Sequence, residues 1–226
     1  RHRVLLIFHS HLLLIPFLGF SNDDFNYTKQ KVINKAYIVN SDAGINIENS
    51  YGSIFVTTWN EDKVEIEVLI KVSGDNEKWV NQKLAGIDVD FVALKSMVSA
   101  KTVFGNTSTK NNGRNNNFEI NYTIKIPKNG TVTLNNKYGN IGTSDLFSTT
   151  DINCKYGKIN LGKLNGNSNT VQIGYCSSST IEYLKNGSIT SKYSGLKMNE
   201  VTKLDLLSDY SEIEINEGND VKYNSK

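Results

Sequence analysis

The sequence is poor in histidine, cysteine and proline. Its 226 residues include 3 His, 2 Cys and 2 Pro, and all three histidines, His2, His9 and His11, lie close to the N-terminus. A mature chain without that leader has no histidine, which excludes a His-dependent catalytic triad and His metal ligands. The low proline content, with 17 Gly, argues against a collagen-like or disordered chain. A chain of this length can bury a single substantial core.

The chain also lacks an uninterrupted apolar run long enough to span a membrane. The apolar stretch over residues 4–20 is broken by polar residues and a proline, and it falls short of the ~20 clean apolar residues that a span requires. Basic residues precede it, and Gly19 and Ser21 close it. This layout predicts a signal peptide over residues 1–21. No cysteine follows for lipid attachment, so we expect export without an anchor, to the periplasm, the outer surface or the medium.

An excess of basic residues is absent as well. Removal of the leader takes Arg1 and Arg3 with it and leaves 23 basic residues from the original 25, against 23 acidic ones. A net charge near zero provides no electrostatic attraction for a polyanion such as DNA or RNA. We therefore expect no nucleic-acid partner.

A phrase built around tyrosine repeats through the second half of the chain. Its tyrosines are separated by 18, 19, 18 and 17 residues, and an earlier copy surrounds Tyr51. The residue four positions before each tyrosine is always aliphatic, and the residue after it is always small. The tyrosines of the later copies are Tyr138, Tyr156, Tyr175, Tyr193 and Tyr210, and the preceding aliphatics, starting with the Tyr51 copy, are Ile47, Leu134, Ile152, Val171, Ile189 and Leu206.

A period near 18 residues is too short for a pair of helices and is typical of one coil of a β-solenoid. We therefore predict an all-β parallel solenoid, in which strands of successive coils pair at a spacing of ~4.8 Å. The aliphatics are expected to fill the interior, the tyrosines to pack at a corner, and the small residue after each to make the tight turn. Two further interior columns, three and eight residues after each tyrosine, include Ser178 and Tyr183.

The period is lost between residues 61 and 130. Residues 64–71 and 118–126 alternate apolar and polar side chains, which predicts two half-buried strands. A short helix is expected between Asp75 and Gly86, and residues 105–117 are expected to form a loop. We predict one domain over 22–226, in which section 61–130 is a broader sheet at the N-terminal end and residues 131–217 are the regular coils.

The two cysteines occupy different places in the repeat. Cys154 lies two residues before Tyr156, whereas Cys176 directly follows Tyr175. The two side chains are therefore not stacked and face differently, so we expect buried thiols rather than a disulfide, although an oxidising compartment would permit one.

At this point the sequence resembles a bacterial family known as the "putative adhesins", small exported right-handed β-helix proteins similar to auto-transporter adhesin heads. The resemblance rests on the leader, on "YTIKIPKNGTVTL", and on the phrases "KYGNI" and "KYGKI", and it covers roughly residues 36–217. It implies a right-handed parallel β-helix in the envelope of a Gram-negative bacterium. It implies no catalytic residues and no cofactor.

Two functions are compatible with such a solenoid. The first is a noncatalytic envelope or surface protein that binds glycans or envelope proteins along one face. The second is a carbohydrate-active β-helix enzyme, a lyase or hydrolase, which needs carboxylates close together on adjacent coils. At the outward positions two and four residues after each tyrosine, acids occur only on the last coil, at Glu212 and Glu214, which favours the noncatalytic function. Asp88 and Asp90 share a strand face without a third ligand, so we expect no metal site.

One outward face is rich in hydroxyls and amides and is edged by lysines. The residue directly before the tyrosine is Lys137, Lys155 or Lys192 in three of the coils. Hydroxyls and amides can hydrogen-bond sugar hydroxyls while lysines attract acidic groups, so these three lysines are the candidate binding residues for an anionic surface glycan. The alternative is an ordinary solvated face whose lysines discourage edge aggregation.

Overall fold

The computed structural model describes residues 25–105 and 115–225. The expected signal peptide and most of the expected loop over 105–117 lie outside the described residues. Strands make up 70% of the chain, and the described residues include one helix, which confirms the all-β prediction. Within the described ranges, no helix is long and apolar enough to cross a membrane.

The elements follow one another as strands, with the single helix between the fourth and fifth. They are β1 (Tyr27–Ile38), β2 (Gly44–Ser50), β3 (Ile54–Trp59), β4 (Lys63–Gly74), α1 (Glu77–Ala85), β5 (Ile87–Ala93), β6 (Met97–Phe104), β7 (Asn116–Pro127), β8 (Val132–Lys137), β9 (Ile141–Thr143), β10 (Thr150–Lys155), β11 (Ile159–Leu164), β12 (Asn169–Gly174), β13 (Ser179–Lys192), β14 (Gly195–Asp209) and β15 (Glu212–Ser225).

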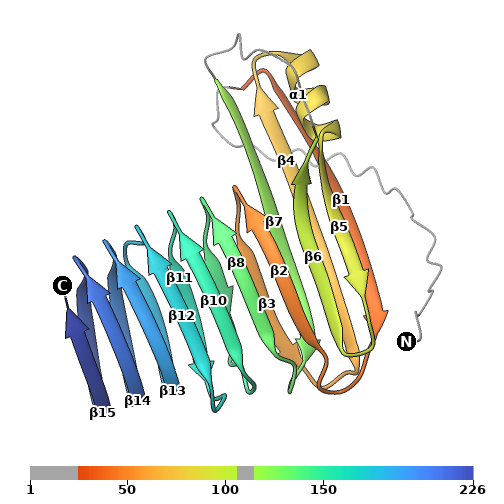
Figure 1. Cartoon of the computed structure of the whole chain (residues 1–226). Helices are drawn as coiled ribbons and strands as arrows, with labels where there is room; N and C mark the ends of the chain where they lie inside the picture. The colour runs from red at the N-terminus through yellow and green to blue at the C-terminus, as the bar shows by residue number, and fades with distance from the viewer. Residues whose placement is uncertain (1–24, 106–114, 226) are drawn as a thin grey trace.

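Residues 132–225 form a β-solenoid of about five coils of ~18 residues. In each coil a strand leads up to the repeated tyrosine, the chain turns, and a second strand leaves on the opposite face. The approaching strands β8, β10 and β12 pair in parallel with one another and then with the end of β13. Figure 1 shows the coils stacked side by side toward the C-terminus.

The aliphatic residues four positions before the tyrosines meet in the interior as predicted. Leu134 pairs with Ile152, and Ile152 pairs with Val171, which is followed by Ile189 and Leu206. All of them are buried. Burial of one such side chain is worth about 1.5–3 kcal/mol before entropy losses, so the coils stabilise one another.

The predicted interior columns after the tyrosine are wrong in the coil of Tyr175, and in the column eight residues after the tyrosine Trp59 is only half-buried and Gly218 is exposed. Asn160 pairs with Thr180, so the residue that stacks on the neighbouring Ile159 in the interior is Ser179 rather than Ser178. Ser178 adopts a φ of 54° as an additional turn residue. The shift continues along the strand, so that Leu184 is buried where Tyr183 was expected. One extra residue in a turn reverses the facing of every residue up to the next turn.

The N-terminal section is a broader mixed sheet. Strand β4 pairs antiparallel with β1 and β7, and β5 pairs antiparallel with β6, whereas β3 pairs in parallel with β7 and β2 with β6. The alternation predicted for β4 and β7 is confirmed, because Val64, Ile66, Ile120 and Ile124 are buried. These strands extend both faces of the solenoid beyond its regular coils (Figure 1).

Helix α1 lies against β4 and β1 and joins the two faces of the sheet section. It begins one residue later than the sequence suggested, because Asn76 rather than Asp75 is the N-cap and accepts a hydrogen bond from the Trp79 amide at 3.0 Å. Val80 is buried, and Trp79 packs against the core. The helix ends at Gly86, as predicted.

Candidate functional site

The repeated tyrosine itself makes the corner of each coil. Tyr51, Tyr138, Tyr156, Tyr175, Tyr193 and Tyr210 all have positive φ angles between 48° and 62°. Non-glycine residues seldom adopt this left-handed conformation because the Cβ crowds the following carbonyl. The prediction that the small following residue makes the turn is therefore wrong.

The small residue is required because neighbouring coils approach closely. A Cβ added to Gly139 would lie 1.8 Å from the Gly52 carbonyl oxygen, and one added to Gly157 would lie 2.0 Å from that of Gly139. Both contacts are with backbone and cannot be relieved by a side-chain movement. The two glycines thus let the corners stack, while the tyrosines adopt the strained conformation.

The six corner tyrosines form a continuous exposed stack, which we call the tyrosine ladder. Successive ring centroids are 5.0 to 5.2 Å apart with interplanar angles of 4° to 21°. The exposed fraction of the tyrosines runs from 42% at Tyr51 to 72% at Tyr210. Each aromatic pair contributes about 0.5–1.5 kcal/mol beyond its area burial, which offsets part of the cost of the left-handed corners.

Stacking decides which part of each ring is available to a ligand. Because the ring faces cover one another, the ladder presents ring edges and phenolic hydroxyls to solvent. The five steps extend the row over roughly 25 Å, at the spacing of the strands themselves. The ladder can therefore offer a row of hydroxyl donors and acceptors to an extended partner.

The N-terminal end of the ladder is closed by a second aromatic cluster. Tyr51 lies 5.0 Å from Phe118 and 6.1 Å from Phe104, measured between ring centroids. The Lys83 ammonium lies 4.0 Å from the Phe118 centroid and 5.3 Å from that of Phe104, and burial lowers the pKa of Lys83. Helix α1 thus covers this end.

Two of the three predicted lysines lie together beside the ladder. Lys137 pairs in register with Lys155, whereas Gly174 stands between Lys155 and Lys192. All three side chains are exposed. The structure therefore brings Lys137 and Lys155 into one site and leaves Lys192 apart from them.

The charges of the three lysines are not equivalent. Lys192 forms an ion pair with Asp209 at 3.5 Å. Lys137 lies against the ladder, and a hydrogen bond with Tyr138 raises the pKa of its ammonium. Within the residues that the structure describes, neither Lys137 nor Lys155 is paired with a carboxylate. These two ammoniums are the ones available to an external acid.

Rows of polar side chains extend from the lysines across the outer face of the approaching strands. Registered pairing stacks hydroxyl, amide and carboxyl groups on successive coils, and these residues are exposed or half-buried, as predicted. The first row is Thr133, Asp151, Thr170 and Ser188, and the second is Asn135, Asn153, Gln172 and Thr190. We call Lys137, Lys155 and the adjoining part of the ladder, Tyr138 and Tyr156, the lysine–tyrosine strip.

The residues considered for an enzyme or a metal site do not converge. Glu214 forms an ion pair with Lys197 at 2.7 Å, and Glu212, Asp88 and Asp90 are exposed strand residues. Among the residues described, there is no group of three or more His, Cys, Asp or Glu side chains able to hold a metal ion.

Both cysteines are buried, as expected, and both are free thiols. Cys176 donates to the carbonyl oxygens of Cys154 at 3.3 Å and Gly174 at 3.4 Å. A hydrogen bond with Cys176, together with burial, raises the pKa of the Cys154 thiol. A buried thiol with a raised pKa is a poor nucleophile, so Cys154 belongs to the packing of the coils.

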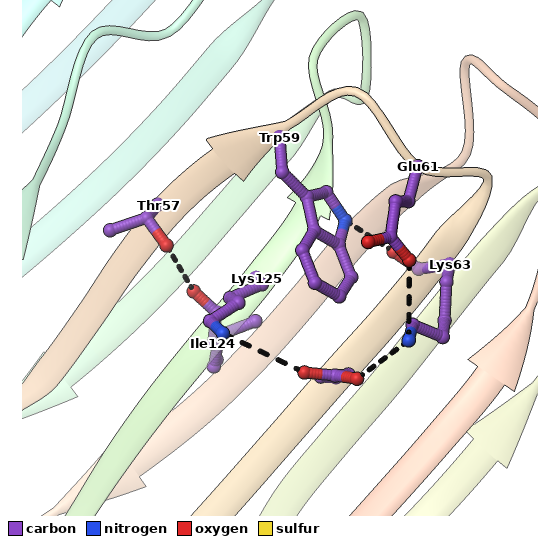
Figure 2. Close-up of polar contacts among 7 residues, drawn as sticks. Thr57, Trp59, Glu61, Lys63, Ile124 and Lys125 are labelled. Atoms are coloured by element: carbon purple, nitrogen blue, oxygen red, sulfur yellow. Dashed lines mark hydrogen bonds and ion pairs between the residues drawn. The ribbon is translucent and has the colours of Figure 1, made fainter.

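A second aromatic feature lies on the edge opposite the ladder and was not predicted. The Trp59 indole donates from Nε1 to the Lys63 carbonyl at 2.8 Å, and the ammoniums of Lys63 and Lys125 lie 4.8 and 5.2 Å from its ring centroid. Glu65 binds both ammoniums, at 2.8 and 3.9 Å. Figure 2 shows the indole between the two lysines.

Comparison with known proteins found matches to solved structures at low sequence identity. No family model matches the chain, and no curated protein matches it. A "putative adhesin" from Bacteroides fragilis is 13% identical, with 86% of this chain and 97% of that chain covered and a TM-score of 0.43. A "putative cell adhesion protein" from Clostridium sporogenes is 11% identical, with 87% and 99% covered and a TM-score of 0.33.

A third structure, a "putative adhesin" from Parabacteroides distasonis, is 10% identical, with 87% of this chain and 97% of that chain covered and a TM-score of 0.34. The chain thus has structural matches to proteins described as adhesins, at low identity and over most of its length.

Proposed function

We propose that the protein is a noncatalytic, exported, adhesin-like protein that binds an anionic surface glycan along the lysine–tyrosine strip. The observation that carries the proposal is the register of Lys137 beside Lys155 at the margin of an exposed row of tyrosine hydroxyls. The two ammoniums attract acidic groups on the glycan, and the hydroxyls and amides of the neighbouring rows bind its hydroxyl groups.

The periodicity of the surface supports an extended ligand. The ladder repeats every 5.0 to 5.2 Å, and a pyranose in an extended polysaccharide advances by a similar length. Successive sugars can therefore meet equivalent groups on successive coils. Many weak, repeated contacts produce a useful total affinity only when the ligand is long.

The experiment is a binding titration of purified protein with polygalacturonate, hyaluronan and heparin at low and high salt. Lys137→Glu with Lys155→Glu is expected to lower the affinity for the polysaccharide that binds wild type best by at least tenfold, whereas Lys192→Glu has a smaller effect because its charge is already offset. Lys185→Glu with Lys203→Glu makes the same change of charge on exposed lysines away from the ladder, and this control is expected to retain binding.

Two results would contradict the proposal. One is the absence of binding to all three polysaccharides, and the other is equal loss of affinity in both double variants, which would indicate an effect of overall charge alone. The noncatalytic part is tested separately, by the length of the polysaccharide after prolonged incubation with the protein. Shortened chains would support the carbohydrate-active alternative.

A further inference from the structure

A shallow, open surface cavity of about 450 Å³ lies on the edge opposite the tyrosine ladder. Its wall combines Trp59 and Asn60 at the end of β3, Lys128 from the turn after β7, and Ser144, Asp145 and Phe147 from the segment after β9. Three segments far apart in sequence thus meet around one volume, which lies within the range of ordinary ligand pockets. We propose that this cavity is a second binding site and that it holds a neutral pyranose residue.

Trp59 is held as a rigid platform before any ligand arrives. Its Nε1 hydrogen bond to the Lys63 carbonyl fixes the ring in its plane. The Lys63 and Lys125 ammoniums lie close to the ring (Figure 2). The Glu65 carboxylate forms ion pairs with both of them. A side chain that is already ordered loses little entropy on binding. A fixed indole suits the C–H face of a sugar ring, which packs on aromatic surfaces.

Phe147 supplies the second aromatic surface. It is 39% exposed, and the Lys128 ammonium lies 4.5 Å from its ring centroid. Trp59 belongs to one coil and Phe147 to the next, so the cavity lies between two successive coils. Two aromatic side chains around a volume of this size are more than a solvated turn requires.

The polar groups of the wall are oriented for hydroxyl groups. The Asp145 carboxylate accepts from the Lys163 amide at 2.9 Å, which fixes its direction. The Ser144 hydroxyl oxygen accepts from the Thr58 amide at 3.2 Å, so its own proton remains able to donate. Asn60 adds an exposed amide with both a donor and an acceptor.

The charges of the wall select a neutral sugar. Lys128 and Asp145 are the two charged residues of the lining, and their opposite charges offset one another. This distinguishes the cavity from the lysine–tyrosine strip, where two unpaired ammoniums favour an acidic ligand. The inference does not depend on the proposed function, because the two sites lie on opposite edges and share no residue.

The test uses the fluorescence of Trp59. The chain has 2 Trp, so a Trp79→Phe background leaves Trp59 as the only indole emitter. We expect saturable change of the emission with at least one of four neutral oligosaccharides, cellohexaose, maltohexaose, chitohexaose and mannohexaose. Phe147→Ala in that background is expected to weaken the affinity about tenfold or more, whereas Tyr223→Ala, at an exposed tyrosine of β15 outside both proposed sites, is expected to leave it unchanged.

Calorimetric titration of wild type with the same four oligosaccharides provides a second measurement, which does not depend on the Trp79→Phe background. Absence of saturable binding to all four, in both measurements, overturns the inference. Equal affinity of the parent and Phe147→Ala also overturns it, because binding would then lie elsewhere. Loss of binding in Tyr223→Ala as well as Phe147→Ala would show that the effect of Phe147→Ala is not local to the cavity and would refute the site.

Discussion

The Lys137 ammonium lies 4.7 Å from the ring centroid of Tyr138 and 5.9 Å from that of Tyr156. One lysine therefore spans two coils of the ladder and fixes a positive charge at the rings of both. The hydrogen bond with Tyr138 raises the pKa of Lys137, so its charge is retained throughout the neutral range. Below the ordinary lysine pKa, the affinity for an acidic ligand at this position is therefore expected not to change with pH through loss of the lysine charge.

The ladder predicts unequal effects of removing its members. Tyr156 stacks on two rings, at 5.1 and 5.0 Å, whereas Tyr210 stacks on one, at 5.2 Å. At about 0.5–1.5 kcal/mol for each aromatic pair, Tyr156→Ala is expected to lower the free energy of unfolding by more than Tyr210→Ala. Urea denaturation of the two variants measures the difference. Equal losses of unfolding free energy in the two variants would show that ring stacking adds no stability beyond that of the corner itself.

The close approach of the corners predicts a contrast between two glycines. Gly157→Ala would place a Cβ 2.0 Å from the Gly139 carbonyl oxygen, whereas at Gly174 the nearest atom is the Lys155 Cγ at 3.7 Å. We expect Gly157→Ala to destabilise the fold by about 2 kcal/mol or more, because backbone must shift. Gly174→Ala is expected to be tolerated. Comparable thermal stability of the two variants would refute the register of the corners.

The inward and outward facing of one strand is tested by neighbouring residues. Ile159 is fully buried, whereas Lys158 is exposed. Ile159→Asp places an unpaired charge among stacked aliphatics and is expected to prevent folding, since the cost exceeds about 4 kcal/mol. Lys158→Asp is expected to fold normally. Circular dichroism of the two purified variants decides the matter, and a folded Ile159→Asp would contradict the assignment.

Alkaline pH is expected to destabilise the protein through Tyr122. Burial raises the pKa of this phenol to about 12 from its ordinary value of 10.0, and the hydroxyl contacts Thr102 at 2.7 Å. Between these values the unfolded chain loses the proton while the folded chain keeps it. Ionisation of Tyr122 therefore leaves the free energy of unfolding unchanged below pH 10. It lowers that free energy as the pH rises toward 12, by an amount on the order of 3 kcal/mol.

Tyr122→Phe removes this ionisation and is the matched control. Its free energy of unfolding is expected to fall less steeply than that of wild type between pH 10 and 12. Urea denaturation at a series of pH values measures both slopes. Identical slopes would show that Tyr122 does not carry the alkaline transition.

The sequence allowed the solenoid to be predicted because parallel coils stack like residues on like residues. The column that contains Ile152 and Val171 follows directly from this rule. The extra residue at Ser178 was missed because the spacing between successive tyrosines does not reveal where within a coil an insertion lies. The ion pair of Lys192 could have been predicted, since Asp209 directly precedes the next tyrosine and occupies the same column.

Other features of the surface had no signal in the repeat. Periodicity identifies which residues stack in a column, but it does not show whether a side chain at a corner is exposed. The left-handed backbone at the corners places the tyrosine rings on the outside. The cavity beside Trp59 was not predictable, because Lys128 and Phe147 come from non-equivalent turns that only the folded chain brings together.

The most direct test of glycan binding on the lysine–tyrosine strip is a backbone NMR titration. The ¹⁵N-labelled protein is titrated with a hexasaccharide of whichever acidic polysaccharide binds it most tightly. The largest chemical-shift changes are expected at Lys137, Tyr138, Lys155 and Tyr156, with little change at Trp59. Changes confined to another face, or no changes at saturating hexasaccharide, would contradict the proposed site.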